Sequence, residues 1–207
     1  MRWAVGSMAR RISGSHGAFR TPESSPRADD LSAAWAEKWP KADPLASRIR
    51  GGKKRWVRFH SLPNSKSTAE TAAESAEILN RHREVLAELL GGSTGVLVLG
   101  ADWDWRDDAA GIVRRLMPAA WPWRVVQTDS DGSMSYVWAA ELDVVDLDPV
   151  LTAVADDRAS VIIADPALDW LYAPYYAGAD VYARSPAQRD SLKLKHADWL
   201  SSRADGL

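Results

Sequence analysis

The stretch WRVVQTDSDGSMSYVWAAEL, residues 123–142, decides the fold class of this chain. Apolar residues alternate with polar ones on both sides of Asp131–Gly132, and an Asp-Gly pair between two such runs is a strong β-hairpin signal. A hairpin joins antiparallel strands, whereas parallel strands need a crossover connection. Helices and strands otherwise alternate along the chain. The hairpin therefore favours a single α+β domain, with a mixed or largely antiparallel sheet flanked by helices.

Further strands are predicted on both sides of this hairpin. The apolar run TGVLVLGAD, residues 94–102, is typical of a buried strand. Residues 55–62, RWVRFHSL, predict a strand in which Val57 and Phe59 point away from Trp56, Arg58 and His60. The segments SVIIAD and DWLYAPYYAGADVYAR predict the last strands, at residues 160–165 and 169–184.

The clearest predicted helix precedes residue 91. Its apolar face consists of Ile78, Leu79, His82, Val85, Leu86, Leu89 and Leu90, and Gly91–Gly92 ends it. Two capping boxes compete for its start, one from Ser67 to Glu70 and one from Thr71 to Glu74. Shorter helices are predicted in residues 107–118, 146–157 and 185–202, the last capped by Ser185.

The first 28 residues are rich in Ser, Gly, Arg and Pro and have no apolar periodicity. We therefore expect a flexible tail over residues 1–28 and a single domain over residues 29–207. The domain is predicted to begin with a helix that Asp30 or Ser32 caps and that Pro40 ends.

Composition limits the classes of function. Of the 207 residues, 46% are hydrophobic and 26% are charged, as in ordinary globular domains, and the net charge of −2 argues against non-specific binding of nucleic acid or membranes. The chain has no cysteine, which excludes disulfides and thiolate chemistry. No apolar run approaches the roughly 18 residues of a membrane helix, and no signal peptide is evident. We expect a cytoplasmic protein without a cofactor.

Tryptophan is unusually frequent, with 11 residues against 2 phenylalanines. Tryptophan buries a large area and usually finds a partner for its indole N–H. Core packing is the favoured interpretation, and a stacking surface for a ligand or a partner protein is the alternative.

The segment RWVRFHSLPNSK, residues 55–66, holds the main candidates for chemistry. His60 suits proton transfer near neutral pH, and Lys66 would be a base or would hold an anion. Arg58 and Ser65 complete this candidate binding set. The structural alternative is that His60 bonds to the loop backbone while Asn64 and Ser65 shape a turn.

Three more candidates for binding lie elsewhere in the chain. His82 sits on the apolar face of the main helix, where it is either a core histidine or a partner of His60. Tyr175 and Asp180 belong to the aromatic turn YAPYYAGAD. The acidic segment DWDWRDD, residues 102–108, suggests a metal hypothesis, but a polar loop that caps a helix is favoured, and no metal site is expected.

Several of these motifs resemble one family. An RFHSLP-x-SK signature covers Arg58–Lys66, an NRH triplet covers Asn80–His82, and a Pro-Tyr turn followed by GAD covers Pro174–Asp180. With the tail DWLS…GL, they resemble an uncharacterised bacterial domain of unknown function over roughly residues 30–207. The family often has Asp-Gly after Pro-Tyr, where this chain has Tyr176–Ala177. The resemblance implies one domain and no known activity.

Three hypotheses for function follow. The first is a cytoplasmic binding or interaction module, of the immunity-protein kind, because no complete catalytic constellation is evident. The second is a small enzyme that acts on an anionic or phosphorylated substrate through the His60 loop. The third is nucleic-acid binding through the basic residues of the 48–66 segment.

Overall fold

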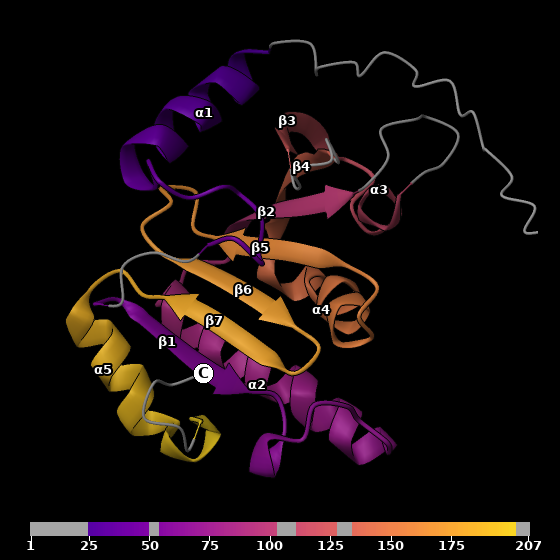
Figure 1. Ribbon diagram of the computed structural model, residues 1–207, viewed down its shortest axis with the longest axis vertical. Coiled ribbons are helices and arrows are strands. Elements are labelled where there is room, and N and C mark those ends of the chain that lie inside the picture. The colour runs from indigo at the N-terminus through magenta and orange to yellow at the C-terminus, as the bar shows by residue number, and fades with distance from the viewer. Residues whose placement is uncertain (1–24, 50–53, 103–110, 128–133, 202–207) are drawn as a thin grey trace, which may run out of the picture.

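One seven-stranded antiparallel sheet organises the residues that the computed structural model describes, which are 25–49, 54–102, 111–127 and 134–201 (Figure 1). Its strands are, in spatial order, β1 (Trp56–His60), β7 (Gly178–Tyr182), β6 (Leu171–Tyr175), β5 (Ser160–Ala164), β2 (Gly95–Asp102), β4 (Met134–Asp143) and β3 (Trp121–Gln127). The α+β class is confirmed. The predicted hairpin is the β3–β4 pair, although its turn lies outside the described residues.

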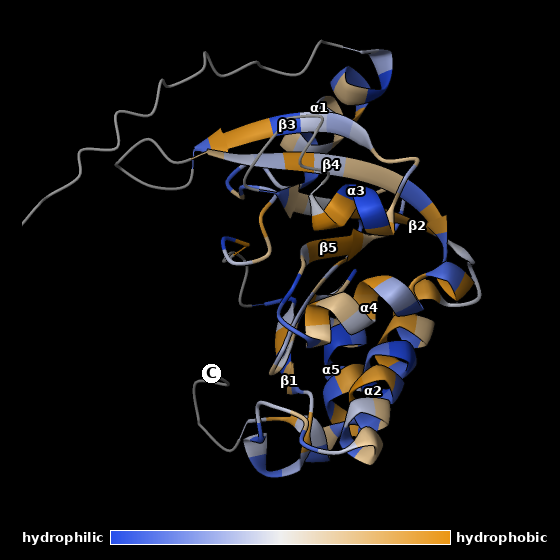
Figure 2. Cartoon of the chain, turned by 90° about the vertical axis from the view of Figure 1, so that its right-hand side faces the viewer, coloured by the Kyte–Doolittle hydropathy of each residue, from blue (hydrophilic) through white to orange (hydrophobic). Residues whose placement is uncertain are grey.

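Helices cover both faces of the sheet. They are α1 (Pro26–Lys38), α2 (Ala72–Leu90), α3 (Ile112–Leu116), α4 (Asp148–Ala155) and α5 (Pro186–Lys195), with short 3-10 turns η1 (Pro63–Ser65), η2 (Val144–Asp146) and η3 (Ala197–Trp199). Figure 2 shows α2 and α4 together on one side of the sheet, with α1 at its far end. Among the described helices, none combines the length and apolar character that a membrane crossing requires.

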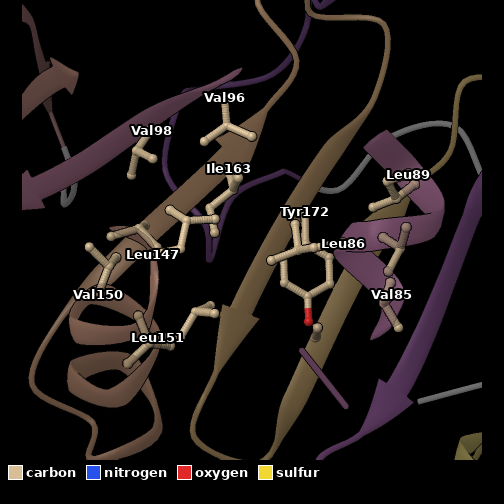
Figure 3. Close-up of a cluster of buried hydrophobic side chains, with 14 of the residues drawn as sticks. Val85, Leu86, Leu89, Val96, Val98, Leu147, Val150, Leu151, Ile163 and Tyr172 are labelled. Atoms are coloured by element: carbon tan, nitrogen blue, oxygen red, sulfur yellow. The ribbon is translucent and has the colours of Figure 1, made fainter. Parts of the chain in front are cut away.

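The larger core lies between the sheet and the helices α2 and α4. Leu86 and Leu89 of α2 and Leu151 of α4 pack against inward residues of β2, β5 and β6, and all are at most 1% exposed (Figure 3). Burying a side chain of this size contributes roughly 1.5–3 kcal/mol. The helical spacing seen in the sequence is thus the face that holds α2 on the sheet.

The second core lies under α1 on the opposite face. Trp35 and Trp39 pack there with Trp123 of β3. The ring centroid of Trp35 lies 6.4 Å from that of Trp39 and 5.6 Å from that of Trp123. Each indole has a partner, since Trp35 donates to the carbonyl of Ala42, Trp39 to that of Leu168 and Trp123 to Ser32 Oγ. Core packing is confirmed for the buried tryptophans Trp35, Trp39, Trp123, Trp138 and Trp170.

The start of α1 differs from the prediction. The helix begins at Pro26, and Ser25 caps it by accepting a hydrogen bond from the amide of Ala28. Neither Asp30 nor Ser32 is the cap, because proline at the first helical position sets the backbone for an earlier start. The predicted tail therefore includes the first turn of α1, and its residues 1–24 lie outside the described residues.

The start of α2 resolves the choice between the two capping boxes. Thr71 Oγ1 accepts the amide of Glu74 at 3.2 Å, and the Glu74 carboxylate accepts the amide of Thr71 in return. Gly91 ends the helix in the left-handed conformation, as predicted. Ser185 caps α5, also as predicted.

We expect Thr71→Ala to lower the free energy of unfolding by about 1 kcal/mol, because it removes an N-cap acceptor. Ser67→Ala is the matched control, since Ser67 belongs to the box that the helix does not use, and it should change stability by less than about 0.5 kcal/mol. Urea unfolding of both variants measures the difference. A larger loss in Ser67→Ala would contradict this assignment of the cap.

Candidate functional site

Strand β1 lies within the RWVRFHSLPNSK segment, and the side chains on its two faces have different environments. Val57 and Phe59 are 4% and 3% exposed and join the core under α2. Trp56, Arg58 and His60 point to the opposite face of the sheet, as the alternation predicted. β1 pairs with β7, which brings residues 56–60 against residues 178–182.

An ion pair between side chains links the paired strands β1 and β7. Arg58 lies directly opposite Asp180 and donates to it twice, from Nε to Oδ1 and from Nη2 to Oδ2, each at 2.8 Å. Trp56 Nε1 donates to the same Oδ1 at 2.9 Å. The two charged side chains are 22% and 15% exposed. The hydrogen bond to Asp180 raises the pKa of Arg58, so the guanidinium group stays charged.

Aromatic rings flank the guanidinium group. Its carbon lies 5.6 Å from the ring centroid of Trp56 and 5.6 Å from that of Tyr175. Burial raises the pKa of Tyr175 to about 12, so its hydroxyl stays protonated. Tyr176 follows it and is 42% exposed. We call Trp56, Arg58, Tyr175, Tyr176 and Asp180 the aromatic–arginine surface.

Gly178 explains why the GAD motif contains glycine. A Cβ atom at this position would overlap the backbone carbonyl of Phe59 on the neighbouring strand and would also lie 3.0 Å from the Tyr175 hydroxyl. Glycine thus permits the close approach of β1 to β7 on which the Arg58–Asp180 pair depends.

Lys66 belongs to a different cluster. Its ammonium group lies 2.7 Å from Glu74 and 3.1 Å from Glu70, at the start of α2. The hydrogen bond to Glu74 raises the pKa of Lys66, whereas a lysine that acts as a general base needs a lowered one. Ser65 is exposed and has a left-handed backbone, with φ of 57°, and so does Asn64. These two residues shape the turn into α2, the role that the structural alternative assigned to them from the sequence.

His82 is buried and bonded to a residue from the sheet. Its Nδ1 lies 2.6 Å from the hydroxyl of Tyr172, and both side chains are at most 2% exposed. Burial lowers the pKa of His82 to about 4, so the ring is neutral at pH 7. His82 is therefore a core histidine with Tyr172 as its partner, and no hydrogen bond between His82 and His60 is present in the described residues.

His60 lies at the end of β1, beside a small cavity. Burial, with the nearby Arg58 and Arg81, lowers the pKa of His60, so that it too is neutral at pH 7. Arg81 donates to the backbone carbonyl of His60 at 3.1 Å and lies over the ring of Trp199. His60, Ser61 and His82 line the same cavity, whose volume is about 10 Å³. A cavity of this volume is too small to hold an organic substrate.

The described residues hold no group of three His, Asp or Glu side chains that would bind a metal ion. Asp102 ends β2, and a hydrogen bond from the amide of Val113 joins it to the start of α3. Burial raises the pKa of Asp102. The helix cap expected from the sequence lies further along the acidic segment, in residues 103–110, which fall outside the described residues, so that interpretation stays a prediction.

The structure thus brings Arg58, Tyr175 and Asp180 together, while among the described residues no hydrogen bond or ion pair joins them to Lys66 or His82. Sequence reasoning missed Trp56 and Tyr176 as members of the surface. The strand alternation was a sufficient signal for Trp56, because it shares a face with Arg58. Tyr172 and Arg81 carried no local signal, since their partners are distant in sequence.

The pKa of His82 predicts a specific pH dependence of stability. Because an unfolded histidine has a pKa near 6.5, the unfolded chain binds more protons between about pH 6.5 and 4, and stability falls as the pH drops through this window. The loss from this residue should be about 3 kcal/mol. Urea unfolding from pH 7 to pH 4 should show that His82→Gln loses less stability than the wild type. Equal losses in both proteins would contradict the assignment.

Comparison with known proteins gives a family and no relative of known activity. No curated protein matches the chain, and no solved structure does. The family described as Domain of unknown function (DUF3885) matches residues 45–204, which include every described strand, the RFHSLP segment and the GAD turn. The chain belongs to this family of domains of unknown function, DUF3885.

Proposed function

We propose that this chain is a cytoplasmic protein-binding module, of the kind of the immunity proteins that block a toxin, and that its partner docks on the aromatic–arginine surface. The observation that carries the proposal is the placement of Arg58 between the rings of Trp56 and Tyr175. Trp, Tyr and Arg are the residues most enriched among those that dominate protein interfaces.

The arrangement is pre-organised for binding. Asp180 fixes the guanidinium by two hydrogen bonds of 2.8 Å, so Arg58 loses little conformational entropy when a partner arrives. In Figure 1, β1, β7 and β6 lie in front of α2, and none of the described helices lies in front of these strands. Tyr176, at 42% exposed, gives a partner an aromatic anchor at the edge.

We propose that the partner presents an apolar patch with acidic residues around it. Lys54 is exposed and Arg55 is partly exposed just before β1, whereas Arg58 is paired with Asp180. The two cations before β1 contrast with the net charge of −2 of the whole chain. Charge complementarity of this kind speeds association and weakens with salt.

The state of the ionisable groups supports binding over catalysis. An enzyme for anionic substrates would need free cations, yet Arg58 is paired with Asp180 and Lys66 with Glu74. No carboxylate in the described residues hydrogen-bonds to the ring of His60, whereas a catalytic histidine usually has such an orienting partner.

Tyr176→Ala tests the proposal directly, because this side chain is exposed and its loss should leave folding intact. Affinity purification from a host lysate at low salt should recover a specific protein with the wild type. With that protein purified, calorimetry should show that Tyr176→Ala weakens binding at least tenfold, as expected when an interface anchor is removed.

Leu194→Ala is the matched control, since Leu194 is 83% exposed on α5 and lies outside the proposed surface. It should bind the partner as the wild type does. Recovery of no specific protein at any salt concentration, or equal affinities for Tyr176→Ala and the wild type, would overturn the proposal.

A further inference from the structure

Two side chains that line the cavity beside β1 each have a polar atom without a hydrogen-bond partner among the described residues. They are Ser61, at its Oγ, and His82, at its Nε2. Ser61 and His82 are each 2% exposed, so bulk solvent does not reach them freely. Buried polar groups in native proteins nearly always have partners, and ordered water molecules are among them.

The volume of the cavity limits which molecule it can hold. A volume of about 10 Å³ is close to the smallest that holds a single water molecule and is too small for an organic ligand. An ordered water molecule typically makes two to four hydrogen bonds, and the unpartnered groups of Ser61 and His82 line this space. Immobilising one water molecule costs less free energy than leaving two buried polar groups unpaired.

We propose that this cavity is a binding site for one ordered water molecule, held by Ser61 and His82. Water fits because it both donates and accepts hydrogen bonds. Nδ1 of His82 already faces the hydroxyl of Tyr172 at 2.6 Å, and the tautomer of the ring decides whether Nε2 is a donor or an acceptor. Water satisfies Nε2 in either case, and it also satisfies the Ser61 hydroxyl.

This site joins two segments that are distant in the sequence. Ser61 of RFHSLP directly follows β1, and His82 ends the NRH triplet on α2. A second link runs parallel to the water, because Arg81 of the same triplet donates to the carbonyl of His60. The water and Arg81 together fix the end of β1 to α2. This inference does not depend on the proposed partner.

Ser61→Ala gives opposite results for a wet and a dry cavity. If the water is bound, alanine removes one of its hydrogen bonds, and the melting temperature should fall by about 2–4 °C. If the cavity is dry, alanine removes an unpaired buried hydroxyl, and the melting temperature should stay the same or rise. An unchanged or raised value overturns the proposal.

Ser32→Ala calibrates the expected loss. The Ser32 hydroxyl accepts from Trp123 Nε1 at 3.0 Å and donates to the carbonyl of Ala28 at 2.6 Å, so its removal breaks two hydrogen bonds. A fall in Ser61→Ala comparable to that in Ser32→Ala supports the water site. A crystal structure of the wild type is the second measurement. Density within hydrogen-bonding distance of Ser61 Oγ and His82 Nε2 supports the site, and empty space between them overturns it.

Discussion

The pairing of β1 with β7 is the constraint on which the candidate site depends. It joins residues 56–60 to residues 178–182, and β7 is the strand that β1 pairs with in the described sheet. Gly178 lets the two backbones approach, and Arg58 then meets Asp180 across the pair with two hydrogen bonds. The rings of Trp56 and Tyr175 lie beside that guanidinium group. The RFHSLP and GAD segments thus largely form the two sides of one strand pair.

The ionisable side chains near this pair are mostly committed to structure. Asp180 neutralises Arg58, Glu74 neutralises Lys66, and Tyr172 partners His82. What stays open to a partner is aromatic and cationic surface rather than a set of reactive groups. For this reason we propose recognition rather than catalysis, because pre-organised rings and a fixed guanidinium contribute to binding without any proton transfer.

Local features were predictable from the sequence, and pairings between distant residues were not. The β3–β4 hairpin, the Gly91 end of α2 and the Ser185 cap of α5 follow from rules that act within a few residues. Even there, two capping boxes of equal local quality could not be ranked, because their surroundings decide between them. Arg58 and Asp180 are 122 residues apart and His82 and Tyr172 are 90 apart, so only the folded sheet reveals them as partners.

A double-mutant cycle on Arg58→Met and Asp180→Asn tests the central claim most directly. If the ion pair organises the β1–β7 pairing, each single variant leaves a partly buried charge without its partner. The loss in free energy of unfolding of the double variant should then be smaller, by at least about 1 kcal/mol, than the sum of the losses of the two single variants. Urea unfolding of the four proteins supplies the free energies. Losses that add to within about 0.5 kcal/mol would show that the pair is not coupled and would contradict the account.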